Sequence, residues 1–130
     1  MAVEFNGGMP KHCPPVEVAP FAGEILRAVP TEPILENHFL SHAEMGKKCD
    51  IQECESWGLS VWLSKEAAVH ARAAFKNLFS KRFIVKISVN EHDGRLLKTP
   101  SNAQPEHHTF WKSSAAQFAS RAEVIMKPEA

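Results

Sequence analysis

The stretch that most constrains the fold is Trp57–Leu63, a predicted strand that leads directly into a predicted helix. Its residues alternate between two sides, Trp57, Leu59, Val61 and Leu63 on one and Gly58, Ser60 and Trp62 on the other. A period of two is typical of a strand with one buried face. Small residues on the second side leave room for another group to approach the backbone. That side is therefore a candidate binding surface.

The segment after this strand has the pattern of an amphipathic helix over residues 65–79. Ser64 precedes it and is a good N-cap, because its hydroxyl can accept a hydrogen bond from a free backbone N–H group. Glu66 lies in the first turn, where the helix dipole favours negative charge. Apolar residues recur on one face at Ala67, Ala71, Ala74, Phe75 and Leu78. This stripe predicts a helix that packs one face on a sheet.

Further strands are predicted from runs of β-branched and aromatic residues. These runs cover residues 23–30, 82–90, 95–98 and 107–111. Asp93-Gly94 separates the second run from the third and predicts a hairpin turn. The run at 122–126 fits either a last strand or the end of a helix.

Together these elements predict a single α+β domain. We expect a mixed or antiparallel sheet of about four to six strands, packed against the main helix at 65–79. Residues 21–130 form this domain, and residues 1–20, with four prolines and two glycines, form an extended N-terminal arm. The expected core is Trp57, Leu59, Val61, Phe75, Leu78, Phe83, Val85 and Ile87.

Composition argues against several classes of protein. Lys plus Arg and Asp plus Glu both number 15, and this zero net charge argues against a general nucleic-acid binder. No apolar run is long enough to span a bilayer, and the first residues lack the pattern of a signal peptide. The three cysteines, an odd number without a secretory context, are expected to be reduced thiols. The predicted location is therefore cytoplasmic, without membrane contact.

Two histidines and two cysteines form a candidate metal site. His38 and His42 are four residues apart, which puts them on one face if the segment is helical. With Cys49 and Cys54 they would supply the two-His, two-Cys set that binds structural zinc. The spacing matches no familiar zinc motif. We therefore expect no bound metal, and these four residues as ordinary loop residues.

The pair His107-His108 in the run at 107–111 is a candidate for acid–base chemistry. Adjacent strand residues point to opposite faces, so one histidine can face a cleft while the other faces away. A histidine in a cleft can act as general acid or base near neutral pH. By alternation His108 shares a face with Phe110, whereas His107 shares one with Thr109 and Trp111. The alternative is a structural histidine beside an aromatic strand.

A further set is Arg27 on the first strand, Ser60 on the central strand and Gln104-x-Glu106 in a loop. Arginine can hold a phosphate through bidentate hydrogen bonds. The order resembles the Arg…Ser…Gln-x-Glu layout of ADP-ribosyltransferases, although Leu59-Ser60-Val61 stands where that family has Ser-Thr-Ser. The resemblance implies an enzyme that handles NAD or another nucleotide, with Arg27, Ser60, Glu106 and His108 around one cleft. Otherwise these residues are structural or solvated.

A second resemblance covers residues 27–111. The segments Phe39-Leu40-Ser41-His42, Gly58-Leu59-Ser60-Val61 and His107-His108-Thr109-Phe110-Trp111 are similar to the FLSH…GLSV…HHTxW skeleton of small bacterial proteins. This resemblance implies a bacterial, cytosolic, stand-alone domain. It brings no activity with it.

Two functions follow from these observations. The first is a small bacterial cytosolic protein that binds a partner protein, for example as an accessory component of a multi-component or defence-type system. The lack of a strong catalytic motif, the extended arm, and Trp62 and Trp111 as aromatic anchors favour this function and need no cofactor. The alternative is the NAD- or nucleotide-handling enzyme. The sequence thus leaves open whether the protein is an enzyme, and it does not specify the oligomeric state.

Overall fold

The computed structural model describes residues 3–15 and 17–129, and all elements below lie within them. The strands are β1 Gly23–Val29, β2 Leu59–Val61, β3 Phe83–Val89, β4 Gly94–Lys98, β5 His108–Lys112 and β6 Glu123–Met126. The helices are α1 Lys65–Ala74 and α2 Lys76–Phe79, with short 3-10 helices at Glu36–Phe39, Cys54–Trp57 and Ala119–Arg121. No helix in the described residues is long and apolar enough to cross a bilayer. The predicted α+β class is confirmed, and the run at 122–126 is a strand.

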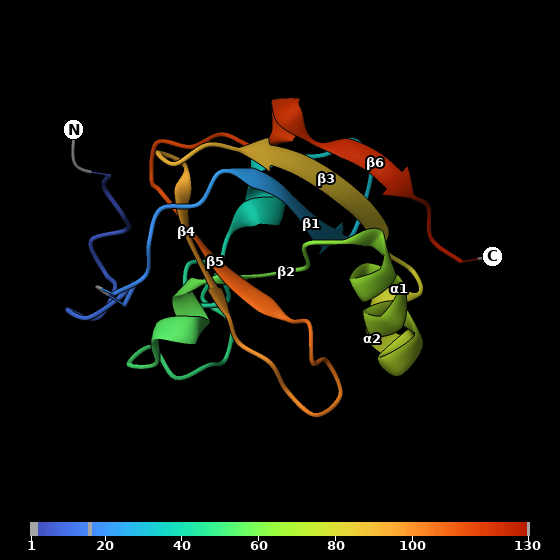
Figure 1. Ribbon diagram of the computed structural model, residues 1–130, viewed down its shortest axis with the longest axis horizontal. Coiled ribbons are helices and arrows are strands. Elements are labelled where there is room, and N and C mark those ends of the chain that lie inside the picture. Colours follow the sequence, from blue (N-terminus) through green and yellow to red (C-terminus); the bar gives the residue numbers. More distant parts are fainter. Residues whose placement is uncertain (1–2, 16, 130) are drawn as a thin grey trace.

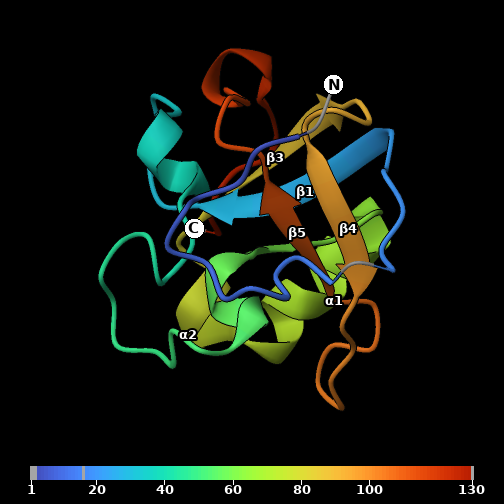
Figure 2. The same cartoon turned by 90° about the vertical axis from the view of Figure 1, so that its left-hand side faces the viewer.

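The strands of the described residues form two antiparallel sheets, ordered β1-β3-β6 and β2-β5-β4. In Figure 1, β1, β3 and β6 lie side by side across the top, with β4 and β5 below them on the left and the helices below on the right. In the second view, β4 and β5 cross the direction of β1 and β3 (Figure 2). The expected strands are therefore present, but they are divided between two sheets rather than joined in one.

β2 links the two sheets. Val61 pairs with His108 of β5, whereas the next residue, Trp62, forms an isolated antiparallel bridge with Leu26 of β1. The two N···O distances of that bridge are 2.9 and 2.7 Å. Because the chain passes from one sheet to the other here, Val61 and Trp62 are both buried, at 0% and 2% exposure. The predicted alternation therefore ends after Val61, and Leu63 is exposed.

Two apolar clusters lie on opposite faces of the β1-β3-β6 sheet. The cluster between the two sheets includes Ile25, Val29, Leu59, Val61, Val85, Ile87, Phe110 and Phe118. The cluster under the helices includes Leu26, Ala28, Trp62, Ala68, Ala71, Phe79 and Ile84. Alternation along β1 explains the division, because Ile25 and Val29 point one way and Leu26 and Ala28 the other. The core residues predicted at Leu59, Val61, Val85 and Ile87 are confirmed, whereas Trp57 and Phe83 are half-buried.

The helix predicted over 65–79 is interrupted at Phe75. It begins as predicted, because the Ser64 Oγ accepts a hydrogen bond from the Ala67 N–H at 3.1 Å. Phe75 then leaves the helical region, with φ −128° and ψ 59°, and α2 starts after it. The face that packs on the sheet changes at this break, so that Phe79 is buried while Phe75 and Leu78 are exposed. The prediction of Phe75 and Leu78 as core residues is therefore wrong.

The turn at Asp93-Gly94 connects two sheets instead of closing a hairpin, because β3 and β4 pair with different partners. The Asp93 carboxylate accepts the Asn90 N–H at 2.8 Å and two N–H groups of Arg121 at 2.6 and 3.0 Å. Gly94 lies so close to β5 that a Cβ would collide with the Trp111 carbonyl. The predicted hairpin is wrong because tertiary contacts direct the chain away from β3.

The N-terminal arm lies against the domain and crosses in front of β5 in Figure 2. The Glu4 carbonyl accepts a hydrogen bond from the Ser114 N–H at 2.8 Å. Pro20, at the end of the arm, forms an isolated bridge with Arg95 of β4. The described part of the arm therefore has fixed contacts along its length.

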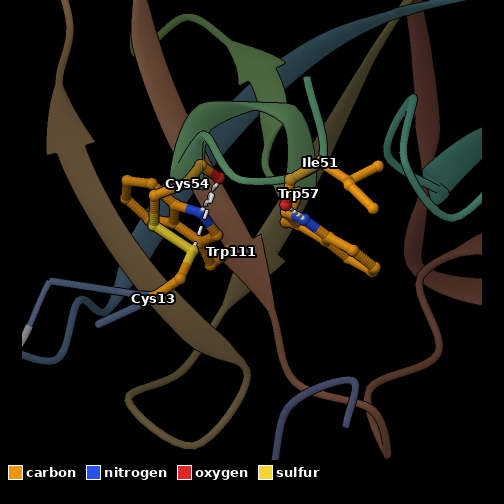
Figure 3. Close-up of a disulfide and its surroundings, with 5 residues drawn as sticks. All are labelled: Cys13, Ile51, Cys54, Trp57 and Trp111. Atoms are coloured by element: carbon orange, nitrogen blue, oxygen red, sulfur yellow. Dashed lines mark hydrogen bonds between the residues drawn. A yellow bond between two sulfur atoms is a disulfide. The ribbon is translucent and has the colours of Figure 1, made fainter. Parts of the chain in front are cut away.

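A disulfide between Cys13 and Cys54 joins the arm to the 3-10 helix before β2. The indole of Trp111 lies beside it, and its Nε1 donates to the Cys54 carbonyl at 3.0 Å (Figure 3). Cys49 is a free thiol. The prediction of reduced thiols is therefore wrong for Cys13 and Cys54, because the fold brings together two cysteines that are 41 residues apart.

Candidate functional site

A cleft of ≈ 430 Å³ opens beside β2. One wall is formed by Gly58, Ser60 and Trp62, the three residues that share the second side of the central strand. The other walls come from β1, the loop after the 3-10 helix Glu36–Phe39, and α2, including the apolar side chains Leu40, Met45, Leu78 and Phe79. The side of the strand with small residues therefore lines a cleft, as a binding surface must.

The cleft is electropositive. Its lining includes the basic side chains Arg27, His42, Lys47, Lys48 and Arg82 and the carboxylate Glu55. Across residues 3–15 and 17–129, the ion pairs that form involve other cations, so none of these lysines and arginines is neutralised by a carboxylate within 4.0 Å. A cleft with this excess of positive charge attracts anions.

Arg27 projects from β1 towards β2. Its Nε donates to the His38 carbonyl at 2.9 Å, and its Nη1 donates to the Ser60 carbonyl at 3.1 Å. A guanidinium carries five N–H donors, so three of them remain for a ligand. Burial, and after it the charge of Arg82, lowers the pKa of Arg27 to about 10. Arg27 is still charged at neutral pH, so an anion in the cleft would relieve an uncompensated positive charge.

The same positive field acts on the histidines. Burial lowers the pKa of His42, and the charges of Lys47, Arg27 and Arg82 lower it further. Burial and the charge of Arg27 likewise lower the pKa of His38. Both imidazoles are therefore mainly neutral at pH 7, because burial and the neighbouring cations oppose a further positive charge.

Ser60, in the wall of this cleft, contacts a histidine that lies outside the cleft lining. The Ser60 Oγ and the His107 Nε2 are 2.9 Å apart. On the other side of the imidazole, Nδ1 lies 3.0 Å from the Thr99 carbonyl and 2.9 Å from the Thr99 hydroxyl. A carbonyl can only accept, so in the neutral ring Nδ1 carries the proton and Nε2 accepts the Ser60 hydroxyl.

The structure brings Arg27 and Ser60 together, as the ADP-ribosyltransferase-like layout requires, but not Glu106 or His108. Glu106 is exposed and pairs with Lys98 at 3.6 Å. His108 is buried, and its Nδ1 contacts the Glu106 carbonyl at 3.0 Å. Glu106 and His108 therefore do not line the cleft with Arg27 and Ser60, because Glu106 lies in an exposed loop and alternation turns His108 to the other face of β5.

His107 is the residue that the sequence placed on the correct face without identifying its partner. It was assigned to the side of Thr109 and Trp111, and Thr109 pairs directly with Ser60 in the β2–β5 register. The pairing of β2 with β5, over nearly fifty residues of sequence, was the missing information. With that register known, alternation alone selects His107 over His108.

The two tryptophans predicted as docking residues are buried. Trp62 is 2% and Trp111 1% exposed. Trp62 packs edge-to-face on Phe79 and donates to the Gln104 side chain at 2.9 Å. Both indoles are almost completely enclosed by the domain rather than exposed for docking, so their prediction as partner-binding residues is wrong.

The candidate metal ligands do not form a site. Cys54 uses its sulfur in the disulfide, and His38 accepts the Leu35 N–H through Nδ1 at 3.2 Å. In the part of the chain that the structure describes, no three His, Cys, Asp or Glu side chains lie close enough to share an ion. The set of His38, His42, Cys49 and Cys54 is therefore not assembled.

Comparison of this chain with protein-family models, curated proteins and solved structures finds no match. The two resemblances noted from short motifs therefore stay predictions. The interpretation of the cleft rests on its own geometry and charge.

Proposed function

We propose that the cleft beside β2 binds a small phosphate-bearing molecule of the nucleotide class. The observation that carries this proposal is Arg27, a cation enclosed between two strands with three N–H donors to spare and no carboxylate partner among the described residues. Arg27 is half-buried, and a charge drawn partly out of water is costly unless it is paired. A ligand phosphate is the partner that such a guanidinium fits best, because it accepts two parallel hydrogen bonds.

The remaining walls suit the rest of a nucleotide. Lys47, Lys48 and Arg82 add positive charge for a second phosphate. Met45 and Leu78, which are 38% and 51% exposed, offer apolar surface for a base or a sugar. The volume of ≈ 430 Å³ lies in the range of about 300–1,000 Å³ that is usual for small-molecule sites. Charge, apolar surface and size thus agree on one class of ligand.

This proposal develops the nucleotide-handling alternative. The 3.1 Å contact between Arg27 and Ser60 supports it. NAD is accordingly the first ligand to test, and Glu106 is not part of the proposed site. The partner-protein function stays a prediction that has lost both of its aromatic anchors, Trp62 and Trp111.

The cytoplasmic location also stays a prediction. Disulfides are rare in reducing compartments and common in oxidising ones, so the bond between Cys13 and Cys54 favours an oxidising compartment. The positive cleft does not depend on this question, because no cysteine lines it.

Isothermal titration with NAD, ADP, pyrophosphate and adenosine tests the proposal. We expect the three phosphate-bearing compounds to bind, with affinity that falls as salt rises, and adenosine to bind at least about tenfold more weakly. Replacing Arg27 by Gln removes a charge-assisted contact worth about 1.5–3 kcal/mol, so the dissociation constant should rise about 10- to 100-fold. The absence of heat with all three phosphate compounds at millimolar concentration would refute the proposal.

Two variants control for damage to the fold. Arg95→Gln is matched to Arg27→Gln, because Arg95 also lies half-buried on a strand and donates to backbone carbonyls, but lies outside the cleft. We expect Arg95→Gln to leave binding unchanged. The double substitution Lys47→Ala and Lys48→Ala changes only exposed residues and should still weaken pyrophosphate binding.

A further inference from the structure

We propose that Ser60 is a nucleophile activated by His107, and that the cleft hydrolyses carboxylic esters of phosphate-bearing alcohols such as O-acylated nucleotides. The substrate class rests on the proposed function, because the phosphate is what the positive cleft would recognise. The nucleophile itself rests on independent geometry, the hydrogen bonds of Ser60, His107 and Thr99.

The three groups have the order that nucleophilic catalysis requires. A nucleophile must lie within hydrogen-bond reach of a base, and a third group must orient that base. The Ser60 Oγ lies 2.9 Å from Nε2 of His107, and Nδ1 of His107 lies 3.0 Å from the Thr99 carbonyl. The Thr99 hydroxyl, itself 2.8 Å from that of Thr109, holds the same edge of the ring. The imidazole is therefore fixed in the tautomer that can take the proton of Ser60.

Exposure separates this pair from an ordinary structural contact. Ser60 is exposed and lines the cleft, while His107 behind it is half-buried. A hydrogen bond to an exposed hydroxyl adds little to stability, because water can replace it. The neighbouring His108 shows the structural alternative, since it is buried and its Nδ1 contacts a backbone carbonyl. Of the neighbours His107 and His108, only His107 presents a ring nitrogen to the hydroxyl of a residue that lines the cleft.

Arg27 supplies positive charge beside the backbone of Ser60. Its Nη1 donates to the carbonyl of Ser60 itself, so the guanidinium lies beside the reacting residue. Attack on an ester carbonyl places negative charge on the carbonyl oxygen, and cationic donors aimed at that oxygen stabilise the charge. Arg82, whose charge lowers the pKa of Arg27, adds to the same field.

The reaction balances without a cofactor or a redox partner. The Ser60 Oγ forms a bond to the ester carbonyl carbon while its proton passes to Nε2 of His107. The C–O bond to the phosphate-bearing alcohol then breaks, and His107 returns the proton to that leaving oxygen. Water attacks the acyl-Ser60 ester, His107 takes the water proton, and the bond to Oγ breaks. Ser60 recovers its proton, and the carboxylic acid is released.

A fluorophosphonate probe tests the nucleophile on the full chain without knowledge of the substrate. We expect the probe to lose fluoride and to form one phosphonyl adduct on Ser60, located by peptide mass spectrometry. Ser60→Ala should abolish the adduct, and His107→Gln should slow its formation by at least about 100-fold. Ser56→Ala is the matched control, because Ser56 lines the same cleft without a histidine partner. Near-UV circular dichroism shows whether each variant keeps the native packing of its tryptophans.

Two outcomes overturn this proposal. If the folded protein gives no adduct on Ser60, or an adduct that forms equally fast in His107→Gln, Ser60 is not an activated nucleophile. A competition experiment tests the shared site, since ADP in the cleft should slow labelling at least about fivefold at a saturating concentration. Labelling that ADP does not slow would refute the substrate class. Titration of Ser60→Ala with ADP then reports the anion site alone, so failure of the two proposals can be told apart.

Discussion

Removal of the Cys13–Cys54 disulfide should destabilise the protein by a predictable amount. The bond links two residues with a sequence separation of 41, and chain entropy then predicts a loss of about 4 kcal/mol when the unfolded chain is no longer constrained. Domains of this size are typically stable by about 5–15 kcal/mol. The variant Cys13→Ser should therefore fold, but with a large part of its stability lost.

Urea unfolding measures this loss. With a slope of about 1–3 kcal/mol per molar urea, a loss of about 4 kcal/mol lowers the midpoint by about 1–4 M. Tryptophan fluorescence suits the assay, because the Trp111 Nε1 bonds to the Cys54 carbonyl at 3.0 Å and the Trp57 Nε1 bonds to the Ile51 carbonyl at 2.9 Å (Figure 3). The Trp111 indole thus lies beside the cross-link, and the Trp57 indole contacts the loop that precedes the 3-10 helix of Cys54.

The free thiol provides the control. Cys49 is half-buried and unpaired, so Cys49→Ser should change the free energy of unfolding by less than about 0.5 kcal/mol. Treatment of the native protein with a strong reductant should reproduce the effect of Cys13→Ser. A change below about 1 kcal/mol for Cys13→Ser, or an equal change for Cys49→Ser, would refute the assigned contribution of the cross-link.

Three further predictions concern pH and packing. Burial alone would raise the pKa of Asp93, but hydrogen bonds from Arg121 and the Asn90 N–H, with the charges of Arg121 and His92, lower it on balance. The stability that the Asp93–Arg121 pair contributes is complete above the unfolded pKa of 3.8 and is lost as pH falls through the lower folded pKa. Asp93→Asn should therefore lower the free energy of unfolding in urea by about 1.5–3 kcal/mol and remove that acid transition. His42 has a lowered pKa in the cleft, and a bound anion favours its charged form. Titration calorimetry should therefore show binding of NAD, whose diester phosphates keep their charge over this range, tighten as pH falls from 7 to 5.5, with the change absent in His42→Gln. A Cβ at residue 58 would collide with the Thr109 methyl. Gly58→Ala should therefore lower the free energy of unfolding, measured by thermal unfolding, by about 1–3 kcal/mol. Gly7→Ala is the control, because a Cβ at residue 7 would have open space around it.

The parts of the fold that depend on local sequence were predictable. Runs of β-branched and aromatic residues predicted β1 and β3, and such runs suit strands whose two faces pack on two different apolar clusters. Ser64 was identified as an N-cap because capping involves only neighbours along the chain. The break at Phe75 was not predictable, because the helical stripe continues through it and the backbone changes direction only in response to packing on the sheet.

The parts of the candidate site that depend on long-range pairing were only half predictable. Arg27 and Ser60 were selected by residue type and strand position, and they are in contact. The choice between His107 and His108 depends on the β2–β5 register, which no local pattern specifies. The same limit applies to Cys13 and Cys54, since spacing does not determine which cysteines meet.

The cleft exists because β2 serves both sheets. Pairing with β5 ends at Val61, and Trp62 then bridges Leu26 of β1. This crossing brings the residue after Leu26, which is Arg27, next to the carbonyl of Ser60, although the two lie 33 residues apart in the chain. A change that loosens the Trp62–Leu26 bridge should therefore separate the guanidinium from the serine while β1-β3-β6 and β2-β5-β4 keep their own ladders. The two hydrogen bonds of this bridge, together with the apolar cluster between the sheets, therefore hold the two strands of the candidate site in place.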